Sequence, residues 1–334
     1  MHGGAFREPF AVTRSIGVIG VGVMGAAHAR LLLHNTPGGR LAGVYDADAQ
    51  RAASFGVKTF QDPLSLIRSD DIDGIVIASP DSTHADYVLA AIAEGKPVLC
   101  EKPIAATAAE ALRIIDAEIA CGRRLVQVGF MRRFDAGYLD LRRARIDGSL
   151  GKTQVLHNVH RNKAAPPWFH GAMVITNAFV HEIDISQWLL NSAVCSAQIF
   201  TVGSDGPLMI TMQTEHDEVI STEVNMNCGY GYHVHAQLVG SAGTIEMAPP
   251  ARTLLNQNGS QSFGFPADWI PRFIAAYRDQ MHAWVMSHTT GAPVGASAWD
   301  GYTTTLIADE LVEALAGFKR TTLTLPQRPD FYRD

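Results

Sequence analysis

The feature of this chain that most restricts its fold is a run of glycines between an apolar segment and a helix-period segment. Ile16–Gly20 is expected to form a strand and Met24–His34 a helix. Gly20, Gly22 and Gly25 join them with the spacing G-x-G-x-x-G. In such a loop the first glycine permits a tight turn, the second lets the backbone approach a pyrophosphate, and the third lets the helix pack close to the strand. The arrangement predicts a dinucleotide-binding unit with the phosphates at the helix N-terminus.

The same alternation of strands and helices continues to about residue 129. The further expected strands are Leu41–Tyr45, Lys58–Phe60, Gly74–Ala78, Pro97–Cys100 and Leu125–Val128. The further expected helices are Ala47–Phe55, a segment capped by Asp62 with Pro63 at its first position, Ser82–Glu94 and Thr107–Cys121. Strands separated by helices in this rhythm predict a Rossmann-type, doubly wound parallel sheet over residues 15–129.

An acidic residue near the glycine loop indicates which dinucleotide is bound. Asp46 follows Gly25 by 21 residues, at the end of the second expected strand. A carboxylate there accepts hydrogen bonds from the ribose hydroxyls and repels a 2′-phosphate, so the sequence favours NAD over NADP. Val23 and Met24, at the helix start, are expected beside the phosphates. The alternative is that the glycines serve packing alone and Asp46 caps the next helix.

Two further loops are expected to border the cofactor, because they follow the carboxyl ends of parallel strands. Ser79 and Pro80 follow the fourth strand. His84, a few residues on, is interpreted either as a neighbour of the cofactor or as a partly exposed residue of the next helix. Glu101 and Lys102 follow the fifth strand, where charged side chains indicate a role in the site and not only in packing.

Composition excludes several classes of function. The 334 residues are enough for two domains, each with its own core. The net charge of −6 and the absence of a basic run with interleaved aromatics argue against nucleic acid as a partner. No apolar stretch approaches the roughly 20 residues of a membrane helix. The four cysteines lie far apart without a metal-binding pattern, so we expect reduced thiols, no metal and a cytoplasmic protein. Residues 1–14 are interpreted as a flexible tail, without the apolar core of a signal peptide.

After residue 129 the pattern changes to a helix followed mostly by strands. We expect residues 130–334 to form an α+β domain with a large, open, mainly antiparallel sheet, joined as a meander. The expected strands are Thr153–Arg161, Ser196–Val202, Leu208–Thr214, Val219–Asn227, Tyr232–Gly240 and Thr244–Ala248, and the expected helices are Phe134–Ile146, Ala178–Leu190, Trp269–Ser287 and Thr304–Phe318. The last two helices are expected to pack back on the first domain.

Polar residues at the start of the expected helix Ala178–Leu190 are candidates for chemistry. Asn177, His181, Asp184 and Trp188 are spaced four, three and four apart, so they share one helical face. The alternative is a capped amphipathic helix in which Asp184 makes an ion pair and His181 is a core histidine. A histidine titrates near neutrality, which suits a group that takes a proton from a hydroxyl during hydride transfer.

Motifs spread over nearly the whole chain resemble one enzyme family. They are Glu101-Lys102-Pro103, the run from Gly129 to Asp135, His160-Arg161-Asn162, His181-Glu182-Ile183-Asp184 with Trp188-Leu189, Tyr230-Gly231-Tyr232, and the run from Gly240 to Ile245. In this order they resemble glucose–fructose oxidoreductase and the inositol 2-dehydrogenase-like enzymes, and the second and third motifs are most similar to the inositol dehydrogenase branch.

The resemblance implies an NAD-dependent oxidoreductase that converts a secondary hydroxyl of a cyclic polyol or sugar to a ketone. It implies His181 as general base, assisted by Lys102, whose ammonium group stabilises the developing alkoxide. The substrate's other hydroxyls would be bound by Arg132, His160, Asn162 and Tyr232 (or Tyr230). The family's second-domain sheet commonly mediates oligomerisation, so a homodimer or homotetramer is implied.

One residue departs from the family pattern. Inositol dehydrogenase-like members carry an Asp four residues before the histidine, where this chain has Asn177. An amide keeps hydrogen-bonding capacity but has no charge. Two alternatives therefore stay open: an NAD-retaining glycoside-processing enzyme with transient oxidation, and a non-catalytic regulator of the same fold that binds dinucleotide and sugar.

Overall fold

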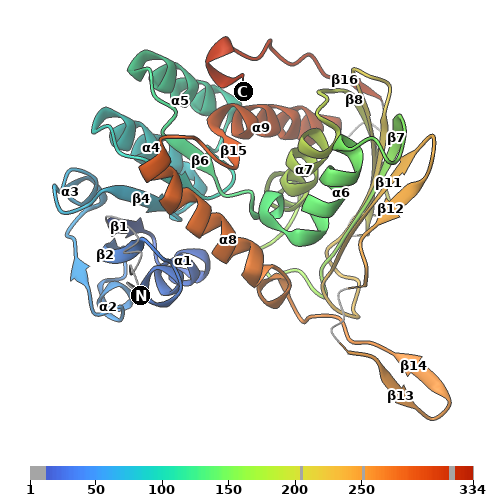
Figure 1. Ribbon diagram of the computed structural model, residues 1–334, viewed down its shortest axis with the longest axis horizontal. Helices are drawn as coiled ribbons and strands as arrows, with labels where there is room; N and C mark the ends of the chain where they lie inside the picture. The colour runs from blue at the N-terminus through green and yellow to red at the C-terminus, as the bar shows by residue number, and fades with distance from the viewer. Residues whose placement is uncertain (1–12, 204–205, 250–252, 316–319, 334) are drawn as a thin grey trace, which may run out of the picture.

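The computed structural model describes residues 13–203, 206–249, 253–315 and 320–333. Residues 1–12 of the expected N-terminal tail lie outside this described part. Arg14, expected in the tail, already belongs to the first strand. Within these ranges the chain forms two seven-stranded sheets and one small projecting hairpin (Figure 1).

The first sheet has the order β15-β6-β5-β4-β1-β2-β3. Its strands are β1 (Arg14–Ile19), β2 (Gly39–Tyr45), β3 (Lys58–Thr59), β4 (Gly74–Ile77), β5 (Val98–Cys100), β6 (Val126–Val128) and β15 (Ala296–Ser297). All neighbours are parallel except β15, which pairs antiparallel with β6. β4 is buried along its whole length, as expected for a parallel strand covered on both faces. The doubly wound parallel sheet is therefore confirmed.

The expected helices of the first half are present, although α2 and α4 each begin two residues later than expected. They are α1 (Val23–His34), α2 (Ala49–Ala53), α3 (Pro63–Ile67), α4 (His84–Ala93), preceded by the short 3₁₀ turn η1 (Asp81–Thr83), and α5 (Ala108–Cys121). The Asp62 side chain accepts a hydrogen bond from the backbone of Ser65 and caps α3, and Thr107 caps α5 in the same way.

The second sheet has the order β12-β11-β7-β10-β9-β8-β16. Its strands are β7 (Thr153–Arg161), β8 (Val194–Thr201), β9 (Leu208–Thr214), β10 (Val219–Asn225), β11 (His233–Gly240), β12 (Thr244–Glu246) and β16 (Thr321–Thr322). The mainly antiparallel sheet is confirmed, but a simple meander is wrong. β7 lies between β10 and β11 and runs parallel to β10. The connection over residues 226–232 is longer than a tight hairpin turn, and it passes this inserted strand.

Helices cover one face of the second sheet and tie it to the first. They are the 3₁₀ turn η2 (Met131–Phe134), α6 (Ala136–Ile146), the π-helical turn η3 (Val174–Phe179), α7 (Val180–Leu190), α8 (Trp269–Thr290) and α9 (Ala298–Ala314), followed near the C-terminus by η4 (Asp330–Tyr332). α9 packs on α5, and Trp284 of α8 joins the core around Ile16 and Val18 of β1. α8 crosses between the two sheets in Figure 1.

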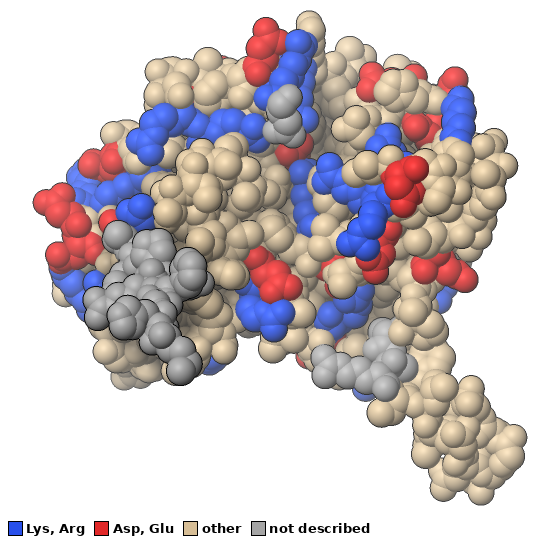
Figure 2. Space-filling view, in the orientation of Figure 1, with Lys and Arg blue, Asp and Glu red and all other residues tan. Residues whose placement is uncertain are grey.

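Charges of both signs are interspersed over the face seen in Figure 2. The projecting hairpin of β13 (Leu255–Gln257) and β14 (Ser260–Ser262) is uncharged in this view. Among the described residues no helix is long and apolar enough to cross a membrane, and no group of three or more His, Cys, Asp or Glu side chains is arranged to hold a metal ion.

Candidate active site

The glycine loop has the geometry that a dinucleotide requires. Gly20 has φ +81°, and a Cβ there would lie 2.7 Å from the carbonyl oxygen of Ala78. A Cβ on Gly25 would overlap the carbonyl oxygen of Gly20, whereas one on Gly22 would meet nothing within 4 Å. α1 begins at Gly22 without a side-chain cap, so its first backbone N–H groups remain for an anion. The loop therefore fits a bound pyrophosphate.

The Asp46 carboxylate is fixed beside this loop. One oxygen accepts a hydrogen bond from the Val21 amide at 2.7 Å, and the other accepts one from the Asp48 amide at 2.9 Å. The Arg51 guanidinium lies 3.4 Å from the Asp46 carboxylate but is half exposed. Asp48, not Asp46, caps α2. The carboxylate at the end of β2 thus presents a fixed negative charge where the adenosine ribose is expected.

His84 and Glu101 act as braces beneath the cofactor loops. The buried His84 ring contacts the carbonyl oxygens of Pro103 at 2.7 Å and of Ser79 at 2.9 Å. The interpretation of His84 as a partly exposed helix residue is wrong. Glu101 is also buried and lies 2.6 Å from His28 of α1. His84 and Glu101 are already paired inside the protein. They are therefore suited to holding the cofactor loops in place.

Ser79 and Pro80 lead from β4 into η1. The Ser79 hydroxyl is within 2.7 Å of the Thr83 hydroxyl, which also donates to the Pro80 carbonyl. These local bonds hold the loop in a turn at the carboxyl edge of the first sheet, beside the glycine loop, where a cofactor contact was expected.

Lys102 follows β5 of the first sheet, His181 lies in the first turn of α7, and the two side chains lie near each other. The half-buried Lys102 ammonium donates to the carbonyl oxygen of Asn177 at 2.9 Å. Burial lowers the pKa of Lys102 from its ordinary value, and the carboxylates of Glu101 and Asp81 oppose this shift. His181 is 9% exposed, and its buried Nδ1 has no hydrogen-bond partner in the part of the chain that the structure describes. Burial, followed by the charge of Lys102, holds the pKa of His181 well below its ordinary range. His181 is thus a neutral imidazole beside an amine, not a satisfied core histidine.

The expected substrate-binding residues divide into two groups. Arg132 is buried in an ion pair with Glu182, and His160 lies 3.0 Å from the other oxygen of Glu182. Tyr232 packs edge-on against the His160 ring at 6.0 Å between ring centroids. These side chains form a connected polar layer below His181.

Asn162 and Tyr230 lie nearer the surface. Asn162 keeps a buried side-chain oxygen without a partner. Tyr230 is 46% exposed and its hydroxyl is bonded to Arg161 and His233. Of the two tyrosines considered from the sequence, Tyr232 is therefore the one that joins the layer around His160. The sequence analysis gave no role to Glu182, which holds this layer together.

Of the four residues expected on one helical face, Asp184 and Trp188 contact arginines away from Lys102. Asn177 lies in the π-helical turn η3 before α7, so the regular α-helical spacing fails there. Asp184 accepts two hydrogen bonds from Arg133 at 2.6 and 3.0 Å. Trp188 lies under the Arg142 guanidinium at 4.1 Å. For Asp184 the ion-pair alternative is therefore the right one.

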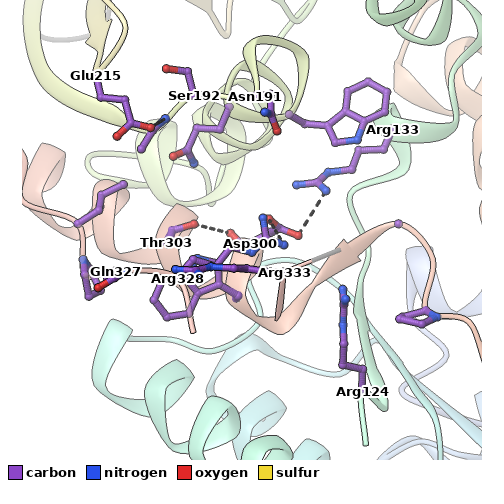
Figure 3. Close-up of a pocket in the computed structure, with 18 of the residues that line it drawn as sticks. Arg124, Arg133, Asn191, Ser192, Glu215, Asp300, Thr303, Gln327, Arg328 and Arg333 are labelled. Atoms are coloured by element: carbon purple, nitrogen blue, oxygen red, sulfur yellow. Dashed lines mark hydrogen bonds and ion pairs between the residues drawn. The ribbon is translucent and has the colours of Figure 1, made fainter. Parts of the chain in front are cut away.

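A cavity of about 660 Å³ lies on this other side of α7 (Figure 3). Figure 3 shows Arg133 and Arg328 pointing toward Asp300 from opposite sides, with closest contacts of 3.4 and 4.0 Å. Neither Lys102 nor His181 lines this cavity. The sequence offered no sign of the Arg133–Asp300 contact, since the two residues are 167 positions apart. We assign this region to bracing α7 and not to the chemistry.

The site combines a Rossmann sheet and its glycine loop with a lysine and a neutral histidine at the carboxyl edge of that sheet. These features define a dinucleotide-dependent oxidoreductase. Two family models match the chain: an oxidoreductase-family NAD-binding Rossmann fold over residues 14–130, and an oxidoreductase-family C-terminal alpha/beta domain over residues 143–322. The chain belongs to this family, that of glucose–fructose oxidoreductase and the inositol 2-dehydrogenase-like enzymes, and its cofactor is NAD.

Its relatives include proteins named as inositol dehydrogenases. The chain is 39% identical to inositol 2-dehydrogenase 2 of Saccharopolyspora erythraea, over 96% of this chain and 98% of that one. It is 38% identical to an inositol 2-dehydrogenase of Klebsiella pneumoniae, over 95% and 98%. Among solved structures, myo-inositol dehydrogenase from Lactobacillus casei, in complex with NAD(H) and myo-inositol, superimposes with a TM-score of 0.93 at 30% identity, covering 96% of this chain and 100% of that one.

Proposed function

We propose that the protein is an NAD-dependent dehydrogenase that oxidises a secondary hydroxyl of a cyclic polyol of the inositol type. The observation that carries this proposal is the neutral, unpartnered His181 beside Lys102 at the edge of the cofactor-binding sheet. The activities named for the relatives support the substrate class.

His181 is proposed to take the hydroxyl proton. Its imidazole is buried and uncharged at neutral pH, so a ring nitrogen is free to accept a proton. Bound NAD supplies the acceptor for the hydride that leaves the same carbon. The Lys102 ammonium stabilises negative charge as it develops on the oxygen. His160, Asn162 and Tyr232, arranged around the Arg132–Glu182 pair, are proposed to orient the remaining hydroxyls.

The test is production of NADH from NAD with a panel of inositols, pyranoses and anhydrosugars. We expect an inositol to give turnover, and we expect His181→Ala to lower kcat by about 100-fold or more, the usual scale for a general base. His282→Ala, which removes an exposed histidine of α8, is the matched control and should leave kcat unchanged. Normal turnover in the His181 variant would remove that assignment. Release of a sugar without net NADH, or binding without turnover, would favour the glycoside-processing or the regulatory alternative.

We further propose a homo-oligomer assembled through the outer face of the second sheet, in the cytoplasm. Exposed apolar side chains on β8, β9 and β10 support the interface: Phe200, Met209 and Val219. The four cysteines, all in the described part of the chain, are unpaired, which suits a reducing compartment.

A further inference from the structure

Asn177, the residue that departs from the family pattern, contacts a carboxylate of the first domain. Its side-chain amide donates to the Asp81 carboxylate at 3.4 Å. Its amide oxygen accepts a hydrogen bond from the Thr176 hydroxyl at 2.8 Å. The two ends of the amide are therefore distinguished, with the NH₂ group toward Asp81. Its backbone carbonyl accepts a hydrogen bond from the Lys102 ammonium.

An aspartate would not fit at this position beside Asp81. Two ionised carboxylates at about this separation repel each other, and the repulsion raises the pKa of one of the pair. With asparagine at 177 the same contact is between a donor and an acceptor. The residue at 177 and the acid at 81 are thus complementary, and the negative charge lies on η1 instead of the turn before α7.

Three carboxylates act on the charge of Lys102: Glu101, Asp81 and Glu182. Of these, Asp81 is the one without an ionic partner among the described residues. Glu101 is bound to His28 at 2.6 Å, and Glu182 is bound to Arg132 and His160. Arg132 opposes the positive charge on Lys102, and His181 is neutral. Among the described residues, the Asp81 carboxylate has its side-chain contact with Asn177.

We propose that Asp81 is a positioning residue for the reaction: through its contact with Asn177 it supplies a carboxylate of the first domain, and so holds the Lys102 ammonium charged and in place. This inference rests on the proposed function only for its catalytic consequence. Asp81 acts through Asn177 and Lys102 and not on the substrate.

The test is a double-mutant cycle of Asp81→Asn, Asn177→Asp and the double variant. We expect each single change to lower kcat by about tenfold, and the double variant to recover to within about threefold of the parent, because coupled neighbours are strongly non-additive. KM for NAD should change little, and the alkaline limb of the rate profile of Asp81→Asn should move to lower pH. Asp86→Asn, an exposed acid in the first turn of α4, is the matched control.

A second readout does not depend on turnover. The pH dependence of acetylation of Lys102 by acetic anhydride, followed by mass spectrometry, reports the pKa of that amine. Without the opposing carboxylate, the pKa of Lys102 in Asp81→Asn should fall by about one unit, and the double variant should restore it. An unchanged Lys102 pKa, or losses of kcat that simply multiply in the double variant, would overturn the proposal. A parent enzyme inactive on every polyol would contradict the proposed function alone, since the acetylation experiment still decides the role of Asp81.

Discussion

At the scale of single residues, His181 determines how activity should depend on pH. A general base must be unprotonated, and burial together with the charges of Lys102, Arg132 and His160 holds the pKa of His181 well below its ordinary value of 6.5. The acidic limb of kcat/KM should therefore lie below pH 6.5, with activity constant from there through neutrality. A profile of kcat/KM between pH 4.5 and 9 measures this. An acidic limb centred above pH 6.5 would show that the base is another group or that the site is open to water.

The site residues differ in how far the sequence could predict them. The roles of Gly20, Gly22 and Asp46 could be predicted because local spacing alone fixes their geometry. His181 and Lys102 were brought together only by the family resemblance, since Lys102 follows a strand of the first sheet and His181 lies on a helix 79 positions further along the chain. The contact between Asp81 and Asn177 could not be predicted, because it joins residues 96 positions apart through a turn whose shape the sequence does not reveal.

At the scale of secondary structure, α7 carries His181 and is held from its other side by a buried ion pair. Asp184 is 1% exposed and bonded to Arg133. Asp184→Ala leaves the Arg133 charge without its main partner, so the free energy of unfolding should fall by about 3–5 kcal/mol. Urea denaturation of the purified protein measures the loss.

An exposed pair of the same chemistry provides the control for this prediction. Asp140 and Arg143 form an ion pair on α6 with side chains 60% and 74% exposed. Asp140→Ala should cost at most about 1 kcal/mol, because water screens such pairs. Equal losses in the Asp184 and Asp140 variants would show that the buried pair does not brace α7.

Element boundaries were predictable where the chain carries local signals, and not elsewhere. Asp62 caps its helix as expected, and the helix expected from Thr107 begins at Ala108 with Thr107 as its cap, because capping depends on a few consecutive residues. β15 was missed because two residues beside a helix give no periodic pattern; their strand character comes from pairing with β6. The turn η3 was missed for a related reason. A π-helical turn has no sequence pattern distinct from that of an α-helix, so the regular α-helical spacing expected from Asn177 to His181 does not hold.

At the scale of the whole molecule, the two sheets differ in how many of their faces are covered by helices. The first is covered by helices on both faces, whereas β8, β9 and β10 alternate buried residues with partly or fully exposed ones. Phe200 and Met209 are register partners on this outer face and are 47% and 41% exposed. The uncharged hairpin of β13 and β14 projects from the same half of the molecule (Figures 1 and 2). An exposed apolar sheet face is typical of a protein interface.

This arrangement predicts that charge on the outer sheet face prevents assembly. The Phe200→Asp and Met209→Asp double variant would place two adjacent carboxylates in the proposed interface, where neither has a cation to pair with and both must lose water. Its mass by light scattering should fall to that of a smaller assembly at a concentration where the parent is oligomeric. Ile146→Asp, which charges an exposed apolar residue of α6, should leave the mass unchanged. A double variant of unchanged mass would place the interface elsewhere, and a parent that is already monomeric would contradict the homo-oligomer. In either case the apolar face would need another partner to explain its exposure.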